Sequence, residues 1–263
     1  MRRRWGILTA MLTLLAGLTL ATGSASASTG TMNISPGGPI HLVSSSAAGN
    51  ASAQGISHAA QSTNWSGYAA TAGTYTSVSA SWTEPTGTCS GSARYSSFWV
   101  GLDGYNSGSV EQTGTDVDCS GGTPQYYAWY EMYPSPSYSY PDTVRPGDHI
   151  SASVTYTGSN HYSLYITDTT RGWHETRTGT LSAPRSSAEV IVEAPCCTAS
   201  GGTLPLANFG TVSFTGSTAN GSALGSAGGV TKITMINNSG TAKDSVSSLS
   251  GGENFSARWL RAN

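Results

Sequence analysis

Side chains able to perform hydrolytic chemistry are concentrated in two stretches of the chain. The first, residues 98–134, reads FWVGLDGYNSGSVEQTGTDVDCSGGTPQYYAWYEMYP and places Gln112 and Glu131 among aromatic residues. The second, residues 188–194, carries Glu189 and Glu193. Peptide hydrolysis needs a base for the attacking water, a donor for the developing oxyanion and an acid for the leaving amine. A glutamate can be both base and acid, and a glutamine amide is a donor that does not titrate.

Both stretches have the alternation of β-strands, whose successive side chains point to opposite faces. In a strand over 125–134, Trp129, Glu131 and Tyr133 project from one side. A carboxylate between two large rings favours the wall of a binding cleft over a solvated edge, because burying it alone is costly. In a strand over 188–194, Glu189 and Glu193 share a face with an apolar residue, which indicates a groove.

Several other kinds of site have no support in the sequence. The chain has neither a G-x-S-x-G elbow nor a pair of D-[ST]-G motifs, and His174–Glu175 lacks the second histidine of H-E-x-x-H. The histidines after residue 62 are scattered, and no C-x-x-C is present. We therefore expect no metal and no cofactor.

The first 27 residues are typical of a secretory signal peptide. Three arginines precede an apolar run from Trp5 to about Leu20, and Ala25-Ser26-Ala27 has the small-x-small pattern of a cleavage site. We therefore expect a secreted, extracellular protein that is not held in a membrane after cleavage, and a monomer. An exported chain would oxidise its cysteines, Cys89, Cys119, Cys196 and Cys197, for which three pairings are possible.

The net charge of the chain limits the classes of molecule that it can bind. Of the 12 basic residues, three lie in the signal peptide, so nine basic and 14 acidic residues would remain, with a net charge of −5. No basic patch is present, which argues against nucleic acid as a partner. Only 10% of the residues are charged, a composition that suits work at low pH.

The rest of the sequence predicts an all-β domain. Residues 28–62 are small and polar and read as a propeptide or a disordered leader. From 63 to 263, short alternating runs such as Val78-Ser79-Ala80-Ser81-Trp82 are separated by Gly, Pro and Asn turns, with no helical stripe. This pattern predicts a two-sheet antiparallel β-sandwich or a barrel.

Five segments in order resemble the glutamic peptidases, the eqolisin family of secreted acid endopeptidases. They are NWSGY (64–68), WVGLDG (99–104), VEQTG (110–114), AWYEMYP (128–134) and AEVIVE (188–193). The resemblance implies a concanavalin A-like (jelly-roll) sandwich of two seven-stranded antiparallel sheets, a polypeptide substrate, and a catalytic dyad of Gln112 and Glu193. It also implies that the site is lined or supported by Trp65, Trp99, Asp103, Trp129, Glu131 and Tyr133.

Two rival functions remain open. A glycoside hydrolase of the same sandwich class would use two carboxylates, either Glu111 with Glu131 or Glu131 with Glu193. A carbohydrate-binding module would use the same aromatic residues as a platform. Gln112 discriminates between these functions, since only the peptidase requires it. For the peptidase we expect activity in the acid range that is lost towards neutrality, as the carboxyls of the site ionise together and repel one another.

Overall fold

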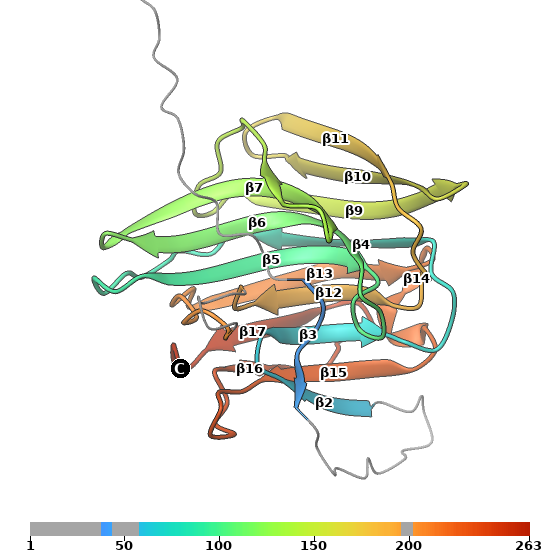
Figure 1. Cartoon of the computed structure of the whole chain (residues 1–263). Coiled ribbons are helices and arrows are strands. Elements are labelled where there is room, and N and C mark those ends of the chain that lie inside the picture. Colours follow the sequence, from blue (N-terminus) through green and yellow to red (C-terminus); the bar gives the residue numbers. More distant parts are fainter. Residues whose placement is uncertain (1–37, 44–57, 196–201) are drawn as a thin grey trace, which may run out of the picture. The chain divides into compact units, whose positions relative to one another are not determined.

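The computed structural model describes residues 38–43, 58–195 and 202–263, and nearly all of their regular structure is β-strand (Figure 1). A single 3-10 turn covers Leu224–Ser226. The strands are β1 (Leu42–Val43), β2 (His58–Ser62), β3 (Trp65–Ala70), β4 (Ser77–Thr83), β5 (Arg94–Leu102), β6 (Val110–Ser120), β7 (Thr123–Tyr133), β8 (Tyr138–Ser139), β9 (His149–Gly158), β10 (His161–Asp168), β11 (Trp173–Thr180), β12 (Ala188–Glu193), β13 (Thr211–Ala219), β14 (Ser222–Ala223), β15 (Val230–Met235), β16 (Asp244–Val246) and β17 (Phe255–Trp259).

These strands form two sheets. The nine-stranded sheet has the order β1-β2-β15-β3-β12-β5-β6-β7-β8, and the eight-stranded sheet has the order β11-β10-β9-β4-β13-β17-β16, with β14 paired to β13. The predicted two-sheet antiparallel sandwich is confirmed. Both sheets have more than the seven strands that the resemblance implied, partly because of two-residue strands such as β1 and β8. The pairing of β2 with β15 is parallel.

The main core lies between the two sheets. In β4 the buried residues Val78, Ala80 and Trp82 alternate with serines that are more exposed, as expected for a strand with one face in the core. In contrast, all six residues of β12 and the first ten of β6 are buried. These central strands of the nine-stranded sheet are therefore covered on both faces.

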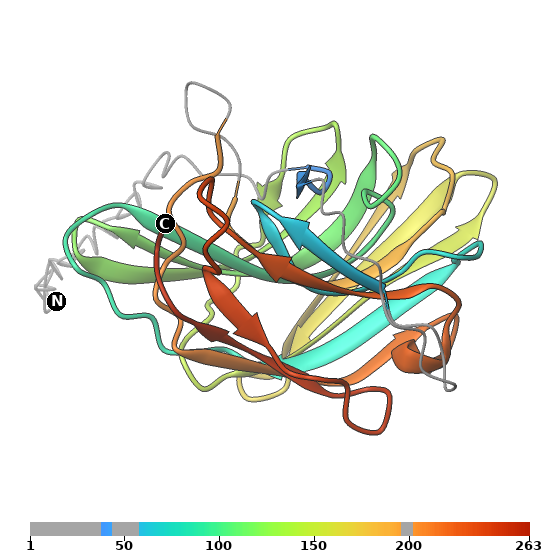
Figure 2. The ribbon, with the colours of Figure 1, turned by 90° about the horizontal axis from the view of Figure 1, so that it is seen from below.

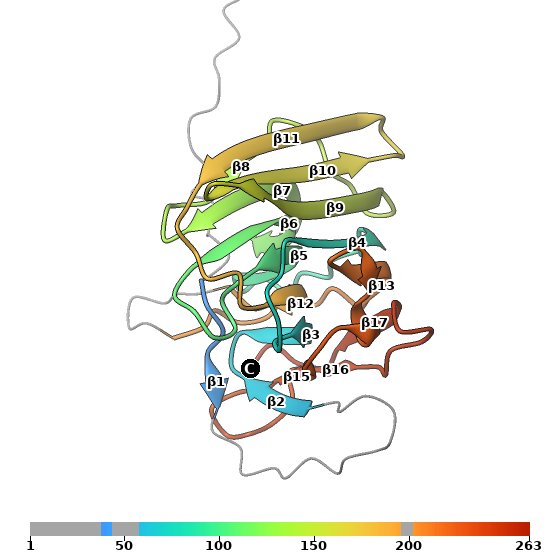
Figure 3. The same ribbon diagram turned by 90° about the vertical axis from the view of Figure 1, so that its right-hand side faces the viewer.

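The second covered face is the outer face of the nine-stranded sheet, which points away from the eight-stranded sheet. Its buried apolar residues form a cluster separate from the main core: Trp65, Ala69, Trp99, Val110, Trp129, Ile191 and Ile233. Figures 2 and 3 show the short strand β1 (blue) on this side of the sheet. An outer face this rich in tryptophan is unusual for a solvated sheet surface, and it marks the region where a site can be sought.

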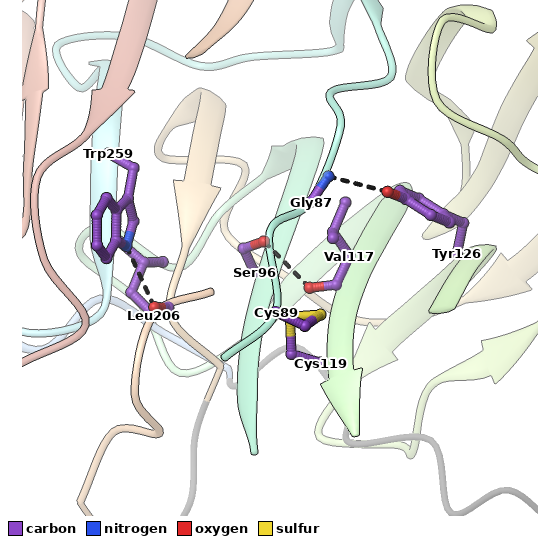
Figure 4. Close-up of a disulfide and its surroundings, with 8 residues drawn as sticks. All are labelled: Gly87, Cys89, Ser96, Val117, Cys119, Tyr126, Leu206 and Trp259. Atoms are coloured by element: carbon purple, nitrogen blue, oxygen red, sulfur yellow. Dashed lines mark hydrogen bonds between the residues drawn. A yellow bond between two sulfur atoms is a disulfide. The ribbon is translucent and has the colours of Figure 1, made fainter. Parts of the chain in front are cut away.

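A disulfide joins Cys89 to Cys119 near the end of β6 (Figure 4). Cys196 and Cys197 lie outside the described residues, as does the predicted signal peptide, residues 1–27. Within the predicted leader, 38–43 and 58–62 are described and contribute β1 and β2, so regular structure begins before Asn64. Among the described residues, no helix is long and apolar enough to cross a membrane, and no three His, Cys, Asp or Glu side chains cluster as metal ligands would.

Candidate active site

Strand register places Gln112 and Glu189 in one row on the outer face. Gln112 in β6 lies opposite Gly101 in β5, and Gly101 lies opposite Glu189 in β12. On the other side, Gln112 lies opposite Glu131 in β7. Directly opposed residues share a face, so a carboxyl, an amide, a glycine and a second carboxyl follow one another across four strands. Two strand spacings separate the Cα atoms of Gln112 and Glu189 by about 10 Å.

Gly101, between the amide and the carboxyl of this row, accommodates the edge of the Trp99 ring. A Cβ at this position would lie 2.8 Å from Cζ3 of Trp99 and 3.2 Å from Cβ of Gln112, so no larger residue fits there without moving the indole. The Nε2 of Gln112 donates to Glu131 at 2.6 Å. The Oε1 of Gln112 and both carboxyl oxygens of Glu189 are buried without a hydrogen-bond partner. Buried polar atoms normally have partners, so these three oxygens are suited to binding a reactant.

Glu193 does not join this row. It lies opposite Ser97, and Ser97 lies opposite Asp116 in β6. Four residues along β12 correspond to about 13 Å, in addition to the two strand spacings that separate β12 from β6. The predicted Gln112–Glu193 dyad therefore needs correction: both residues face the same side of the sheet, but the register brings Glu189, not Glu193, to Gln112.

Glu193 is instead tied to neighbouring side chains. Its Oε2 accepts from the indole N–H of Trp99 at 2.9 Å, and its Oε1 accepts from Nδ2 of Asn64 at 3.4 Å. Because the Trp99 ring reaches from Gly101 towards Glu193, it separates the Gln112 row from the Glu193 row. Glu193 thus holds the indole that borders the site.

Burial controls the electrostatics of the row. It raises the pKa of Glu189 well above the ordinary value, and the charges of Asp103 and Glu111 add to this shift. Burial also raises the pKa of Glu131 to about 8, although the hydrogen bond from Gln112 lowers it. Both carboxyls are accordingly protonated in the acid range while the site is closed to water.

Asp103 supports the site from behind. It has a positive φ of 70° at the end of β5, and its carboxylate accepts from the backbone N–H groups of Arg185 at 2.8 Å and Ser186 at 2.7 Å. The N–H of Asp103 in turn donates to the carbonyl of Ser187. These bonds fix the loop that enters β12, and they therefore set the position of Glu189.

The other predicted lining residues, Trp65, Trp129 and Tyr133, lie on the outer face. Trp65 packs edge-on against Trp99, with ring centroids 4.8 Å apart. Trp129 donates its indole N–H to Asp116 at 2.5 Å. Tyr133 is partly buried, two residues beyond Glu131 and on the same face of β7.

The carboxylate pairs of the rival glycosidase are not assembled. Glu111 lies opposite Leu102, a residue of the main core, so its side chain points away from Glu131. Glu131 and Glu193 share the outer face but lie in different rows and on strands separated by β6 and β5. Neither pair can flank one glycosidic bond.

Three residues of this site were not assigned a role from the sequence: Glu189, Gly101 and Asn64. Alternation along 188–194 makes Glu189 and Glu193 equivalent, and only the register between strands distinguishes them. Asn64 and Gly101 belong to the resembling segments, but nothing in the sequence shows what they contact.

Comparison with known proteins identifies the family of the chain. The family model described as the peptidase A4 family matches residues 63–259. Scytalido-glutamic peptidase, solved with a transition-state analogue inhibitor, is 28% identical and has a TM-score of 0.65, with 75% of this chain and 98% of that chain covered. Aspergilloglutamic peptidase from Aspergillus niger is 29% identical and has a TM-score of 0.55, with 64% and 99% covered.

A third similar structure is SCP-B, a member of the eqolisin family solved in complex with the tripeptide Ala-Ile-His. It is 24% identical and has a TM-score of 0.61, with 75% of this chain and 98% of that chain covered. Among curated proteins, no sequence matches the chain. The extent of the family match shows that the chain belongs to the peptidase A4 family, the glutamic peptidases or eqolisins, and that it is a glutamic endopeptidase.

Proposed function

We propose that the protein is a secreted acid endopeptidase in which Gln112 and Glu189 form the catalytic dyad. The observation that carries this proposal is the row Gln112–Gly101–Glu189, in which an amide and a carboxyl flank a residue without a side chain. Similarity to glutamic peptidases supports a polypeptide substrate. The export pattern of residues 1–27 supports secretion and removal of the signal peptide.

Each member of the row has a distinct task. Glu189, once ionised, takes a proton from the attacking water and later delivers it to the leaving amine. Gln112 donates an N–H to the oxyanion, and its carbonyl oxygen orients the water. Glu131 accepts the other N–H of Gln112, which fixes the orientation of the amide. Glu131 is thus a positioning residue.

Burial of Glu189 opposes an acid working range, because a protonated carboxyl cannot take a proton from water. The pKa of Glu189 is raised mainly because the carboxyl is removed from water. Opening the outer face to water will lower this pKa towards the ordinary carboxyl range, where a base that works in acid must lie. Once the outer face is open to water, the carboxyls of the row ionise together as the pH approaches neutrality, repel one another and oppose substrate binding.

Four variants test the assignment on a denatured protein substrate between pH 2 and pH 7. Gln112→Ala should lower kcat by about a hundredfold to a thousandfold, as for the loss of an oxyanion donor. Glu189→Gln should abolish cleavage, Glu111→Gln should retain it, and Glu193→Gln should retain cleavage with a higher KM. Loss of activity in Glu193→Gln with full activity in Glu189→Gln would restore the dyad that the sequence suggested.

A further inference from the structure

Residues Gly38–Val43, called here the crossing segment, lie on the outer face against Tyr133 and the tryptophan cluster. Gly38 is buried against Tyr133, since a Cβ at Gly38 would lie 2.8 Å from the tyrosine ring. Ile40 packs against the outer-face tryptophan cluster, and its N–H donates to the carbonyl of Gly104 at 3.1 Å. The segment ends as β1, which pairs with β2 (Figure 2).

The amide side chain of Asn64 holds this segment by its main chain. The Oδ1 of Asn64 accepts from the N–H of His41 at 2.7 Å, and its Nδ2 donates to the carbonyl of Pro39 at 3.3 Å. One amide thus contacts a donor and an acceptor of the same backbone on either side of Ile40. Such a contact recognises the backbone of the bound segment and does not depend on the identity of its side chains.

Other groups fix the orientation of this amide. Ser62 donates its hydroxyl to Oδ1 of Asn64 at 2.8 Å, while Oε1 of Glu193 accepts from Nδ2 at 3.4 Å. A hydroxyl donor on one side and a carboxylate acceptor on the other leave a single favourable orientation. Asn64 is fully buried beneath the crossing segment, and its bonds to Ser62 and Glu193 do not involve that segment.

We propose that Asn64 binds the main chain of the polypeptide substrate, and that Gly38–Val43 occupies this position in the full chain and must leave before substrate enters. This inference rests on the proposed function. The crossing segment contacts the protein mainly through backbone groups, as an endopeptidase substrate of variable sequence must. Only Ile40 places an apolar side chain against the tryptophan cluster, which indicates a preference for an apolar residue between the two groups that Asn64 binds.

The first test displaces the segment in the full chain. Ile40→Lys places a charge against the tryptophan cluster and should release the segment, whereas Leu42→Lys, at a position that is 49% exposed, should not. Binding of a labelled Gly-Pro-Ile-His-Leu-Val peptide is measured by fluorescence anisotropy in a Glu189→Gln background. We expect binding at least about tenfold tighter in Ile40→Lys than in the parent or in Leu42→Lys. Equal binding in all three proteins would refute the proposal that the crossing segment competes with the peptide.

The second test isolates the contact of Asn64. The same peptide, methylated on the backbone nitrogen of its histidine, cannot donate to Oδ1 of Asn64. In the Ile40→Lys protein, methylation should weaken binding by about threefold to tenfold, the range of one hydrogen bond. In Ile40→Lys/Asn64→Ala it should have no effect, an outcome that a purely structural role of Asn64 would not produce. The same loss in both proteins would refute the role of Asn64.

Both readouts are binding constants, so they do not depend on catalysis. If the protein binds the peptide as expected but cleaves no substrate at any pH, the proposed dyad is wrong and the main-chain site stands. If it cleaves substrate while the methylation effect is independent of Asn64, the dyad stands and this inference fails.

Discussion

Replacing Glu111 by glutamine should change how the stability of the protein depends on pH. Glu111 is fully buried and points into the main core, and neither carboxyl oxygen has a hydrogen-bond partner. Burial, with a smaller contribution from the charge of Asp103, raises its pKa from 4.5 to about 9. In the unfolded chain the group ionises near its ordinary value.

The direction of the change in stability with pH follows from the protonation of Glu111 in the folded and unfolded states. Below about pH 4.5 the carboxyl is protonated in both states and contributes no pH dependence. Between the unfolded and the folded pKa only the unfolded state loses its proton, so stability falls as pH rises. Each pH unit amounts to about 1.36 kcal/mol, which sets an upper limit of about 3.4 kcal/mol between pH 4.5 and pH 7. Relaxation of the folded state will reduce this, and we expect a loss of about 1.5 to 3 kcal/mol.

The assay is urea unfolding of the parent and of Glu111→Gln at pH 3.5 and pH 7. The fixed effect of exchanging a carboxyl for an amide is present at both pH values and cancels in the difference. Between pH 3.5 and pH 7, the unfolding free energy of the variant should therefore increase by about 1.5 to 3 kcal/mol relative to that of the parent. Glu253→Gln, at a partly exposed turn residue, is the matched control. A difference below about 0.5 kcal/mol would show that Glu111 is ionised in the folded protein.

Other expected outcomes test the row and its supports. Gly101→Ala should lower kcat at least about a hundredfold, measured on a denatured substrate, because a Cβ there meets the Trp99 ring at 2.8 Å; unchanged kcat would exclude a reaction over Gly101. Tyr127→Phe should lower the unfolding free energy by about 1 to 3 kcal/mol at pH 4, since the hydroxyl lies 2.9 Å and 2.8 Å from Asp116 and Asp118 and its one proton can serve only one of them. Removing the Cys89–Cys119 disulfide, which joins residues 30 apart in sequence, should cost about 3 to 4 kcal/mol in the same assay. Activity should be higher at pH 4 than at pH 7, and the opposite profile would contradict the proposed lowering of the Glu189 pKa when the outer face opens to water.

The fold was predictable because its signal is local. Alternating apolar and serine residues, as in Ser77–Thr83, define a strand with one buried face without reference to any other part of the chain. The same rule correctly placed Trp129, Glu131 and Tyr133 on one side of β7, and Glu189 with Glu193 on one side of β12. The sheet order could not be predicted in this way, because β12 pairs with β3 and β5, strands that are distant from it in the sequence.

The same limit explains why the sequence predicts a pair of Gln112 and Glu193, although the strand register places Glu189 in the row of Gln112. Alternation with a period of two shows which residues share a face of the sheet. It does not show which of them lie in the same row as a given residue of a neighbouring strand. A shift of four residues along β12 keeps the side chain on the outer face and moves it about 13 Å, from the row of Gln112 to the opposite side of the Trp99 ring. The informative residue is Gly101, since a row in which an amide and a carboxyl face one another needs a position without a side chain between them. Glu193 then acquires a different task, holding Trp99 and Asn64 in place, and both partners belong to the motifs that accompany it in the sequence.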